Sequence, residues 1–291
     1  MLPFWVVDIW VDGDAERAVS VCLPVHNAED AVVSALSGVT TWDYDGPLHL
    51  ICVPNGCTDR SAERARSAAP LFAARGWRLT VSEIDAPQKV AALKHAESLA
   101  SEGWFLALDV HVRPHRDALR QVLEHAETRD LSVASAQLRY VVEGSAAVRR
   151  FARAYGRTPY ARGNDLKGTF VAVAPDRRHL VAEMPGVGSE DRYYLRATPR
   201  DQRGSVDDAV VEYHFPGGLK SLVRQQARWH RNNAALDDRL PGGDPPAHEA
   251  DRWPYFSPRP SMLDIATYAA VWTAAFALAR IRPTESTAWS R

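Results

Sequence analysis

Short apolar runs rich in β-branched residues alternate with helix-forming stretches along the first half of the chain. Apolar runs of this length, bounded by turn residues, are typical of buried strands. The runs cover residues 19–24, 48–53, 77–84 and 104–108, and helices are predicted over 29–36, 60–74, 89–100 and 114–126. Four successive strand–helix units predict an α/β fold with a mostly parallel sheet, and such sheets bind ligands at the carboxyl ends of their strands.

The second half of the chain is less regular. Further strands are predicted over 131–140, 167–174 and 206–215, and further helices over 145–155, 190–197 and 219–232. A stretch rich in Pro and Gly over 240–260 is the best candidate linker, and an apolar helix over 262–281 follows it. Residues 1–11 are apolar but lack a basic start and a small-residue cleavage site, so we expect no secretory signal there.

The composition excludes several classes of protein. With 46% hydrophobic and 24% charged residues, the chain of 291 residues has the composition of a folded globular protein. A net charge of −1 argues against a nucleic-acid-binding protein. Cys22, Cys52 and Cys57 form no Cys-x-x-Cys pair, which indicates reduced thiols and a cytoplasmic location. The basic residues are 31 Arg and only 4 Lys, a bias typical of a GC-rich bacterial genome.

Polar side chains collect where the predicted strands end. Asn27 and Glu29 follow the first strand, Asn55 follows the second, and Asp109 and His111 follow the fourth. Each of them alone also suits a structural role as a turn residue, a helix cap or a solvated charge. Their order along the chain is therefore more informative than any one of them.

Six short motifs occur in a fixed order between residues 19 and 233. They are PVHNAE at 24–29, PNGCTD at 54–59, QKVAAL at 88–93, DVH at 109–111, ED at 190–191 and QQARW at 225–229. As a set they resemble the inverting family-2 glycosyltransferases, which have the GT-A fold. Four positions depart from the family pattern. His26 stands at the aromatic position, Asn55 stands where an acidic residue is common, Gln88 replaces a Gly and His111 replaces the last Asp of the metal signature.

The resemblance implies that the motifs of the first half bind a nucleotide-diphosphate sugar, and we expect a UDP-sugar. Hydrogen-bonding side chains after neighbouring strands suit the base and the ribose, and a Lys at a helix start suits a phosphate. The residues that carry this expected role are Pro24, Val25, Asn27, Glu29, Asn55, Lys89 and Asp109.

The resemblance also implies a divalent metal, Mn²⁺ or Mg²⁺, that stabilises the leaving diphosphate. Asp109, His111 and His214 are the candidate ligands. A carboxylate combined with imidazoles favours Mn²⁺, because Mg²⁺ prefers oxygen ligands. An ordinary strand histidine is an equally good interpretation of His214.

For catalysis, the resemblance assigns Asp191 as the general base, with Glu190 beside it. Asp191 opens a predicted helix after a Gly-rich turn at 185–188, and a helix start predicts a carboxylate that stays ionised at neutral pH. Attack from the face opposite the leaving group would invert the anomeric centre. The last motif supplies the residues expected on the acceptor or diphosphate side, which are Gln225, Arg228 and Trp229.

We expect a GT-A domain over residues 1–240, with a nucleotide-sugar-binding half at 19–140 and an acceptor-binding half at 141–240. Residues 241–291 would form the linker and the apolar helix. The acceptor is a glycan, a lipid-linked molecule or a small molecule, and no nucleic acid is expected. The helix at 262–281 is expected to dock on the domain or to lie on a membrane surface, which would make the protein peripheral to the membrane. Insertion of this segment into the membrane stays open as the alternative.

Two alternatives remain open. A GT-A-like nucleotidyltransferase would also bind a nucleotide and a metal, but it more typically has a Gly-rich loop with a basic residue after the first strand. A non-catalytic glycosyltransferase-like subunit is the other, and the presence of Asp109, Glu190 and Asp191 argues against it.

Overall fold

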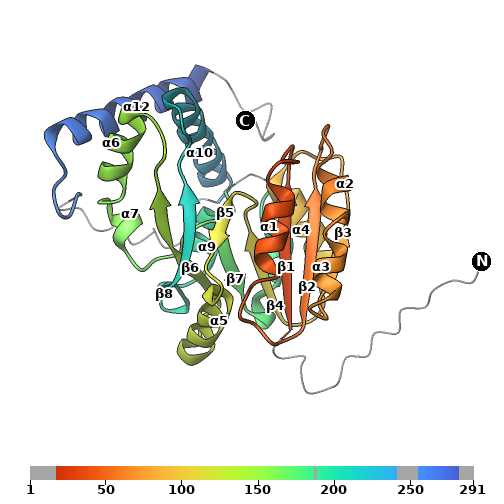
Figure 1. Ribbon diagram of the computed structural model, residues 1–291. Coiled ribbons are helices and arrows are strands. Elements are labelled where there is room, and N and C mark those ends of the chain that lie inside the picture. The colour runs from red at the N-terminus through yellow and green to blue at the C-terminus, as the bar shows by residue number, and fades with distance from the viewer. Residues whose placement is uncertain (1–17, 187–188, 241–254, 282–291) are drawn as a thin grey trace, which may run out of the picture.

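The computed structural model describes residues 18–186, 189–240 and 255–281. Its centre is an eight-stranded sheet with the order β3-β2-β1-β4-β7-β6-β8-β5 (Figure 1). The strands are β1 (Val19–Val25), β2 (Leu48–Pro54), β3 (Arg78–Val81), β4 (Trp104–Leu108), β5 (Val112–Pro114), β6 (Val133–Val141), β7 (Phe170–Val173) and β8 (Arg203–His214). The expectations for residues 1–11, for Val187 and Gly188, and for 241–254 lie outside the described residues.

Helices cover both faces of the sheet. They are α1 (Val32–Val39), α2 (Ser61–Arg66), α3 (Ala69–Ala73), α4 (Lys89–Leu99), α5 (Ala118–Arg129), α6 (Ala146–Tyr155), α7 (Pro159–Arg162), α8 (His179–Glu183), α9 (Glu190–Ala197), α10 (Leu219–Arg239) and α12 (Met262–Ile281), with 3-10 turns η2 (Pro175–Arg177) and η3 (Arg200–Gln202). One core cluster joins the sheet to α1, α2, α3 and α5, and a second joins it to α4, α8 and α9. Successive side chains of a strand point to opposite faces, so Val21 enters the first cluster and Cys22 the second.

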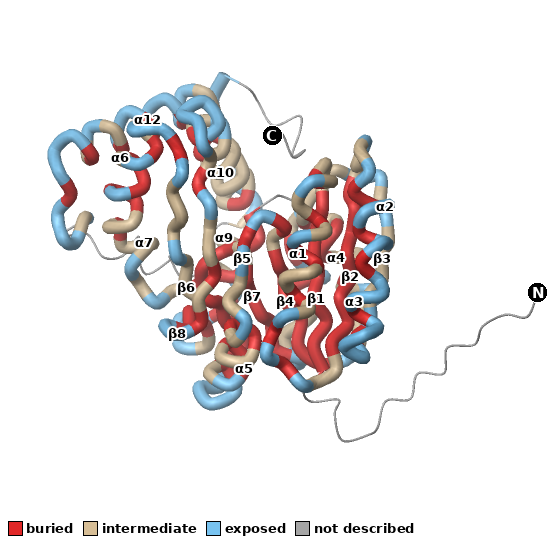
Figure 2. The backbone as a smooth tube through the Cα atoms, viewed as in Figure 1, coloured by how far each residue is buried: buried red, intermediate tan, exposed pale blue. Residues whose placement is uncertain are grey.

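The first half of the sheet is parallel, as the strand–helix alternation predicts. β1 lies between β2 and β4 and pairs in parallel with both, and β3 pairs in parallel with β2. Every residue of β1 and β2 is buried, and these strands form the continuous red core in Figure 2. Burial of both faces explains why their sequences are continuous apolar runs without polar alternation. The carboxyl ends of β1, β2 and β4 therefore meet at one edge.

The second half of the sheet is mixed. β7 pairs antiparallel with β4 and β6, while β8 runs parallel to β6 and antiparallel to β5. The predicted α/β class and GT-A-like mixed, mostly parallel sheet are confirmed. The register of β5 on β8 pairs Val112 with Tyr213, which brings the residue before Val112 opposite the residue after Tyr213. His111 and His214 are those two residues.

Several predicted boundaries were wrong, each for a local reason. The helix expected over 60–74 is two helices, because Pro70 cannot continue a helix and instead lies in the first turn of α3. The helix expected over 114–126 begins at Ala118, because Pro114 ends β5. The strand expected over 77–84 is confined to Arg78–Val81. The three Cys are free thiols, as expected.

The apolar segment at 262–281 forms one helix, α12, which packs across α6 and α10 (Figure 1). Phe151 and Tyr155 of α6, Leu222 of α10 and Tyr268 of α12 share one buried cluster. Arg153 of α6 donates two hydrogen bonds to Asp264, of 3.2 Å to Oδ2 and 2.7 Å to Oδ1. A carboxylate near the start of α12 therefore holds the helix on the domain.

The outer side of α12 stays apolar and exposed (Figure 2). Met262, Leu263 and Ile281 are 69%, 54% and 75% exposed. Its 20 residues are long and apolar enough to cross a membrane by length and composition, although a single helix of this kind is weak evidence.

We predict that Asp264→Asn lowers the free energy of unfolding by about 1–2 kcal/mol, near the low end for a charged hydrogen bond because Arg153 is half exposed. The hydrogen bond from Arg153 holds the pKa of Asp264 below its ordinary value. The contribution of this hydrogen bond to stability is therefore fully present above the ordinary carboxyl pKa. It is lost as the pH falls through the lowered pKa of Asp264 in the folded protein. Denaturant unfolding of both proteins at pH 7 and at stepwise lower pH measures this. Asp176→Asn, at a 72% exposed carboxylate, is the matched control, and equal losses in both variants would contradict the prediction.

Candidate active site

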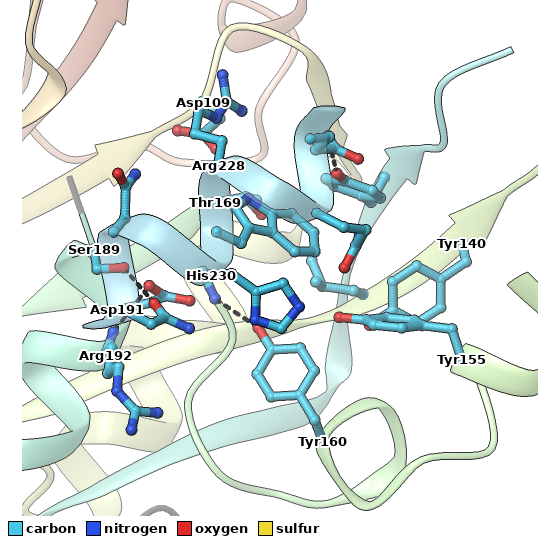
Figure 3. Close-up of a pocket in the computed structure, with 18 of the residues that line it drawn as sticks. Asp109, Tyr140, Tyr155, Tyr160, Thr169, Ser189, Asp191, Arg192, Arg228 and His230 are labelled. Carbon is cyan, nitrogen blue, oxygen red and sulfur yellow. Dashed lines mark hydrogen bonds between the residues drawn. The ribbon is translucent and has the colours of Figure 1, made fainter. Parts of the chain in front are cut away.

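A cavity of about 470 Å³ opens beside the carboxyl end of β4 (Figure 3). Its lining comes from both halves of the sheet: the β4–β5 connection, β6, β8, α9 and α10 all contribute. Side chains of α6 and α12 close it on the far side. The cavity therefore depends on the second half of the chain and on the tail helix as much as on the parallel strands.

A buried cation joins two carboxylates at one end of the cavity. Lys89 is the first residue of α4, Asp109 directly follows β4, and Glu190 is the first residue of α9. Lys89 Nζ donates to Glu190 Oε1 and forms an ion pair with Asp109 Oδ1. Burial alone would lower the pKa of Lys89, but the charges of Asp109 and Glu190 and the hydrogen bonds to both raise it above its ordinary value. Lys89 is therefore a permanent cation.

Asp191 lies next to this cluster, half-buried in the cavity lining. The backbone N–H of Arg192 donates to its Oδ1 at 2.9 Å. Its Oδ2 faces Gly168, where an added Cβ would lie only 3.2 Å from that oxygen. Burial, with the charge of Glu190, raises the pKa of Asp191 to about 6. The helix-start argument did not include these two effects, which leave a carboxylate that is largely ionised at pH 7 yet basic enough to accept a proton.

The candidate metal ligands Asp109, His111 and His214 all line this cavity. The pairing of β5 with β8 brings the two histidines opposite each other across the strands. Within residues 18–186, 189–240 and 255–281, however, no three His, Cys, Asp or Glu side chains converge as a ready metal site. Their role as ligands stays a prediction.

The Gln-x-x-Arg-Trp motif lies on α10 and faces the cavity. Gln225, Arg228 and Trp229 all line it, and Gln225 Nε2 donates to the Tyr213 hydroxyl at 2.8 Å. Gln225 Oε1 is buried without a hydrogen-bond partner. The neighbouring Gln226, which the sequence did not single out, is 1% exposed, and its Nε2 also lacks a partner.

The residues expected to hold the base and ribose lie outside the cavity lining. Pro24 and Val25 are buried within β1. Asn27 Oδ1 accepts from the backbone N–H of Thr58 at 2.8 Å, which ties the loop after β1 to the loop after β2.

Glu29 Oε2 makes a similar bond with the backbone N–H of Arg60 at 3.0 Å. The side chain of Asn55 is fully buried, and both its polar atoms lack a partner. Asn27 and Glu29 thus have a structural role, because their side chains hold the loop after β2 to the loop after β1. Their role in nucleotide binding stays a prediction.

The sequence did not identify the aromatic lining of the cavity. Tyr140, Tyr155 and Tyr160 come from β6, α6 and α7, while Tyr268 and Trp272 come from α12. They are scattered over more than a hundred positions with no common spacing, so only the folded chain brings them together. The one available signal was the concentration of Tyr in the second half of the chain, which holds seven of the nine.

Comparisons with known proteins agree with this fold. No curated protein sequence matches the chain. Among solved structures, a mannosyltransferase from Pyrobaculum calidifontis, in complex with GDP-mannose and Mn²⁺, is 18% identical with a TM-score of 0.59, covering 93% of this chain and 77% of that one. Glucosyl-3-phosphoglycerate synthase from Mycobacterium tuberculosis, with Mn²⁺ and UDP-glucose, is 18% identical with a TM-score of 0.53, covering 82% and 87%.

A third solved structure, S. aureus TarS with UDP-GlcNAc, is 12% identical with a TM-score of 0.52, covering 91% of this chain and 74% of that one. At these identities the likeness establishes the fold alone. The family model for glycosyl transferase family 2 matches residues 20–177, which is more than half of the chain and contains the first four motifs. The chain therefore belongs to glycosyl transferase family 2.

Proposed function

We propose that this glycosyltransferase moves a sugar from a nucleotide-diphosphate sugar to an acceptor hydroxyl with inversion, and that a divalent metal assists the reaction. The observation that carries the proposal is Asp191, a cavity carboxylate with a pKa raised to about 6, beside the cluster of Lys89, Asp109 and Glu190. A base for the acceptor and a cation for the diphosphate then lie in one cavity.

In the proposed reaction, the acceptor oxygen attacks the anomeric carbon and the bond from that carbon to the diphosphate oxygen breaks. The bonding electron pair leaves with the diphosphate, and the acceptor proton passes to Asp191. Oδ1 of Asp191 already accepts from the Arg192 N–H, so Oδ2 is the oxygen proposed to take the proton. One displacement on the face opposite the leaving group inverts the anomeric centre.

Lys89 at the start of α4 is proposed to contact the donor diphosphate together with the helix amides. Pro24, Val25, Asn27, Glu29 and Asn55, at or just after the ends of β1 and β2, are proposed to contact the base and ribose. The mannosyltransferase, TarS and the phosphoglycerate synthase have nucleotide sugars in their structures, which supports this class of donor. We propose a UDP-sugar for this chain.

For the metal, we propose Asp109 with His111 and His214 as the holding residues. All three belong to one cavity, and one carboxylate with two imidazoles is a donor set that suits Mn²⁺. Such an ion supplies positive charge to the leaving diphosphate. Two of the similar structures contain Mn²⁺, which supports the same choice.

We propose that the exposed side of α12 rests on a membrane surface. Met262, Leu263 and Ile281 provide an apolar strip, while Tyr268 and Trp272 face the cavity. A spanning orientation would withdraw those two rings from the cavity, so surface contact is the orientation compatible with the docked helix.

We predict that Asp191→Asn lowers kcat by about 10²–10⁴-fold, the usual value of general-base assistance. Donor affinity changes little, since the amide keeps the shape of the carboxylate. Turnover and donor binding are measured separately, with Asp208→Asn, an exposed carboxylate of β8, as the control.

The pH profile provides a second readout for Asp191. In the wild type, kcat/KM falls as pH drops through about 6, because the base takes up a proton. The Asn variant lacks this acid limb. Near-normal turnover of the variant would remove Asp191 from the mechanism and make Glu190 the next candidate.

We predict that donor binding requires a divalent cation. Asp109→Asn is expected to lose the metal and, with it, most of the affinity for the donor. Mutation of a residue that only hydrogen-bonds a metal ligand typically lowers metal affinity by roughly 10–100-fold. Loss of the charged ligand Asp109 itself is expected to lower it further. His111→Ala has a smaller effect and shifts preference toward Mg²⁺. Titration of the donor with Mn²⁺, Mg²⁺ or excess chelator tests this, and unchanged affinity in chelator would overturn it.

For the membrane contact, we predict that the protein co-sediments with phospholipid vesicles and is released by alkaline carbonate. A Met262→Ser, Leu263→Ser double variant sediments less, since it removes much of the exposed apolar strip. Leu71→Ser, at an exposed Leu of α3, is the control. Resistance of the wild type to carbonate would contradict surface contact.

A further inference from the structure

The end of the cavity away from Lys89 and Asp109 is built almost entirely of aromatic rings. Figure 3 shows Tyr140 and Tyr155 on the side opposite Asp191, Tyr160 between them and Asp191, and Asp109 near Arg228. We call this end the aromatic wall and define it by its six rings: Tyr140, Tyr155, Tyr160, Tyr213, Tyr268 and Trp272. They come from five elements far apart in the chain.

The rings of the aromatic wall pack against one another, so their arrangement is preformed. Tyr140 packs edge-on against Tyr155 at 5.4 Å and against Tyr213 at 6.1 Å, and Tyr155 packs edge-on against Tyr160 at 6.3 Å. Tyr268 and Trp272 lie 5.7 Å apart on α12. Edge-to-face packing of this kind holds the rings in fixed orientations. Tyr155 and Tyr268 also stack on Phe151 at 5.8 and 5.3 Å, which covers one face of each ring.

No fixed charge belongs to the aromatic wall. Burial raises the pKa of Tyr140, Tyr155, Tyr160, Tyr213 and Tyr268, so these phenols stay neutral. His230, whose ring lies 4.4 Å from that of Trp272, has its pKa lowered by burial and is also neutral near pH 7. The guanidinium of Arg192, another lining residue, is held by Asp237. A charged ligand body would lose its hydration over these rings. The cations nearest to them are Lys167, 5.0 Å from the centroid of the Tyr160 ring, and Arg228 of the same cavity lining.

A few polar atoms along the cavity lack a protein partner. They include Thr169 Oγ1, Gln225 Oε1, Gln226 Nε2 and His230 Nε2, together with the Tyr140 hydroxyl and Trp272 Nε1 of the aromatic wall, and all are buried. Buried polar atoms are normally hydrogen-bonded, so a group of them facing one cavity points to a ligand with a few polar atoms. A wide apolar surface with few polar groups is the usual design of a small-molecule site.

The aromatic wall ends at the catalytic carboxylate. The Tyr160 hydroxyl accepts a hydrogen bond from the backbone N–H of Gly168 at 3.4 Å, and Gly168 abuts Asp191. A molecule lying on the rings can therefore present a hydroxyl to Asp191. The rings carry five phenol hydroxyls and one indole N–H, so the hydrogen bonds of a ligand on them would come from these groups and from the polar atoms named above.

We propose that the aromatic wall is the acceptor subsite and that it takes an uncharged small molecule with a flat aromatic body, which carries the reacting hydroxyl. This inference rests on the proposed function. It makes α12 a part of the acceptor site, through Tyr268 and Trp272.

The test measures release of UDP or GDP from UDP-glucose, UDP-GlcNAc and GDP-mannose with three acceptor sets. These are naphthol and benzyl-type alcohols, neutral mono- and disaccharides, and 3-phosphoglycerate. We expect stimulation above basal donor hydrolysis only with the aromatic alcohols. Trp272→Leu is expected to raise their KM by about tenfold or more, since it removes one stacking face.

The matched control is Phe276→Leu, on the same helix but 48% exposed and outside the cavity lining. It should leave the acceptor KM unchanged. Tyr268→Phe, which keeps the ring, should also retain acceptor binding. Transfer to saccharides or to 3-phosphoglycerate with no effect of Trp272→Leu would overturn the acceptor assignment and leave the proposed function intact. Failure to bind or cleave any donor would instead count against the proposed function.

Discussion

The site depends on one buried ion-pair cluster, in which Lys89 lies between Asp109 and Glu190. Its three members begin α4, follow β4 and begin α9, and Lys89 and Glu190 are 101 residues apart in the chain. Without the cation, Asp109, Glu190 and Asp191 would repel one another at a partly dehydrated site. The same positive charge suits a donor diphosphate, so the group that stabilises the donor-free site is also equipped to bind the anionic substrate.

Asp191 illustrates how tertiary surroundings override a local sequence argument. A helix start stabilises a carboxylate by about 0.3–1 kcal/mol, which is less than the 1.36 kcal/mol that one pKa unit represents. Burial and the neighbouring charge of Glu190 together raise the pKa to about 6, from an ordinary value near 4. The charge of Glu190 is visible in the sequence, since that residue is adjacent to Asp191. The larger effect, burial, is not visible there because it depends on how Gly168 and the rest of the lining pack around the carboxylate.

The parts of the fold that could be predicted are those with a strong local pattern. β1 and β2 are buried on both faces and read as continuous apolar runs, and Asp109, Glu190 and Asp191 belong to motifs that keep their order along the chain. β5, α7 and α8 are three to five residues long, too short for any periodicity to appear. The aromatic wall has no motif at all, since its rings converge only after β6, α6, β8 and α12 have packed.

The packing side of α12 was hidden for a different reason. α12 has apolar residues on every face. The buried Val271 and Ala275 are therefore as apolar as the exposed Met262 and Leu263, and hydrophobicity does not reveal which face packs. Composition alone therefore left docking, surface contact and membrane crossing open. The cavity narrows this choice, because Trp272 can line it only while α12 lies across α6 and α10. A helix that completes the proposed acceptor subsite from one side can still touch a membrane from the other, and this would hold the mouth of the site close to that surface.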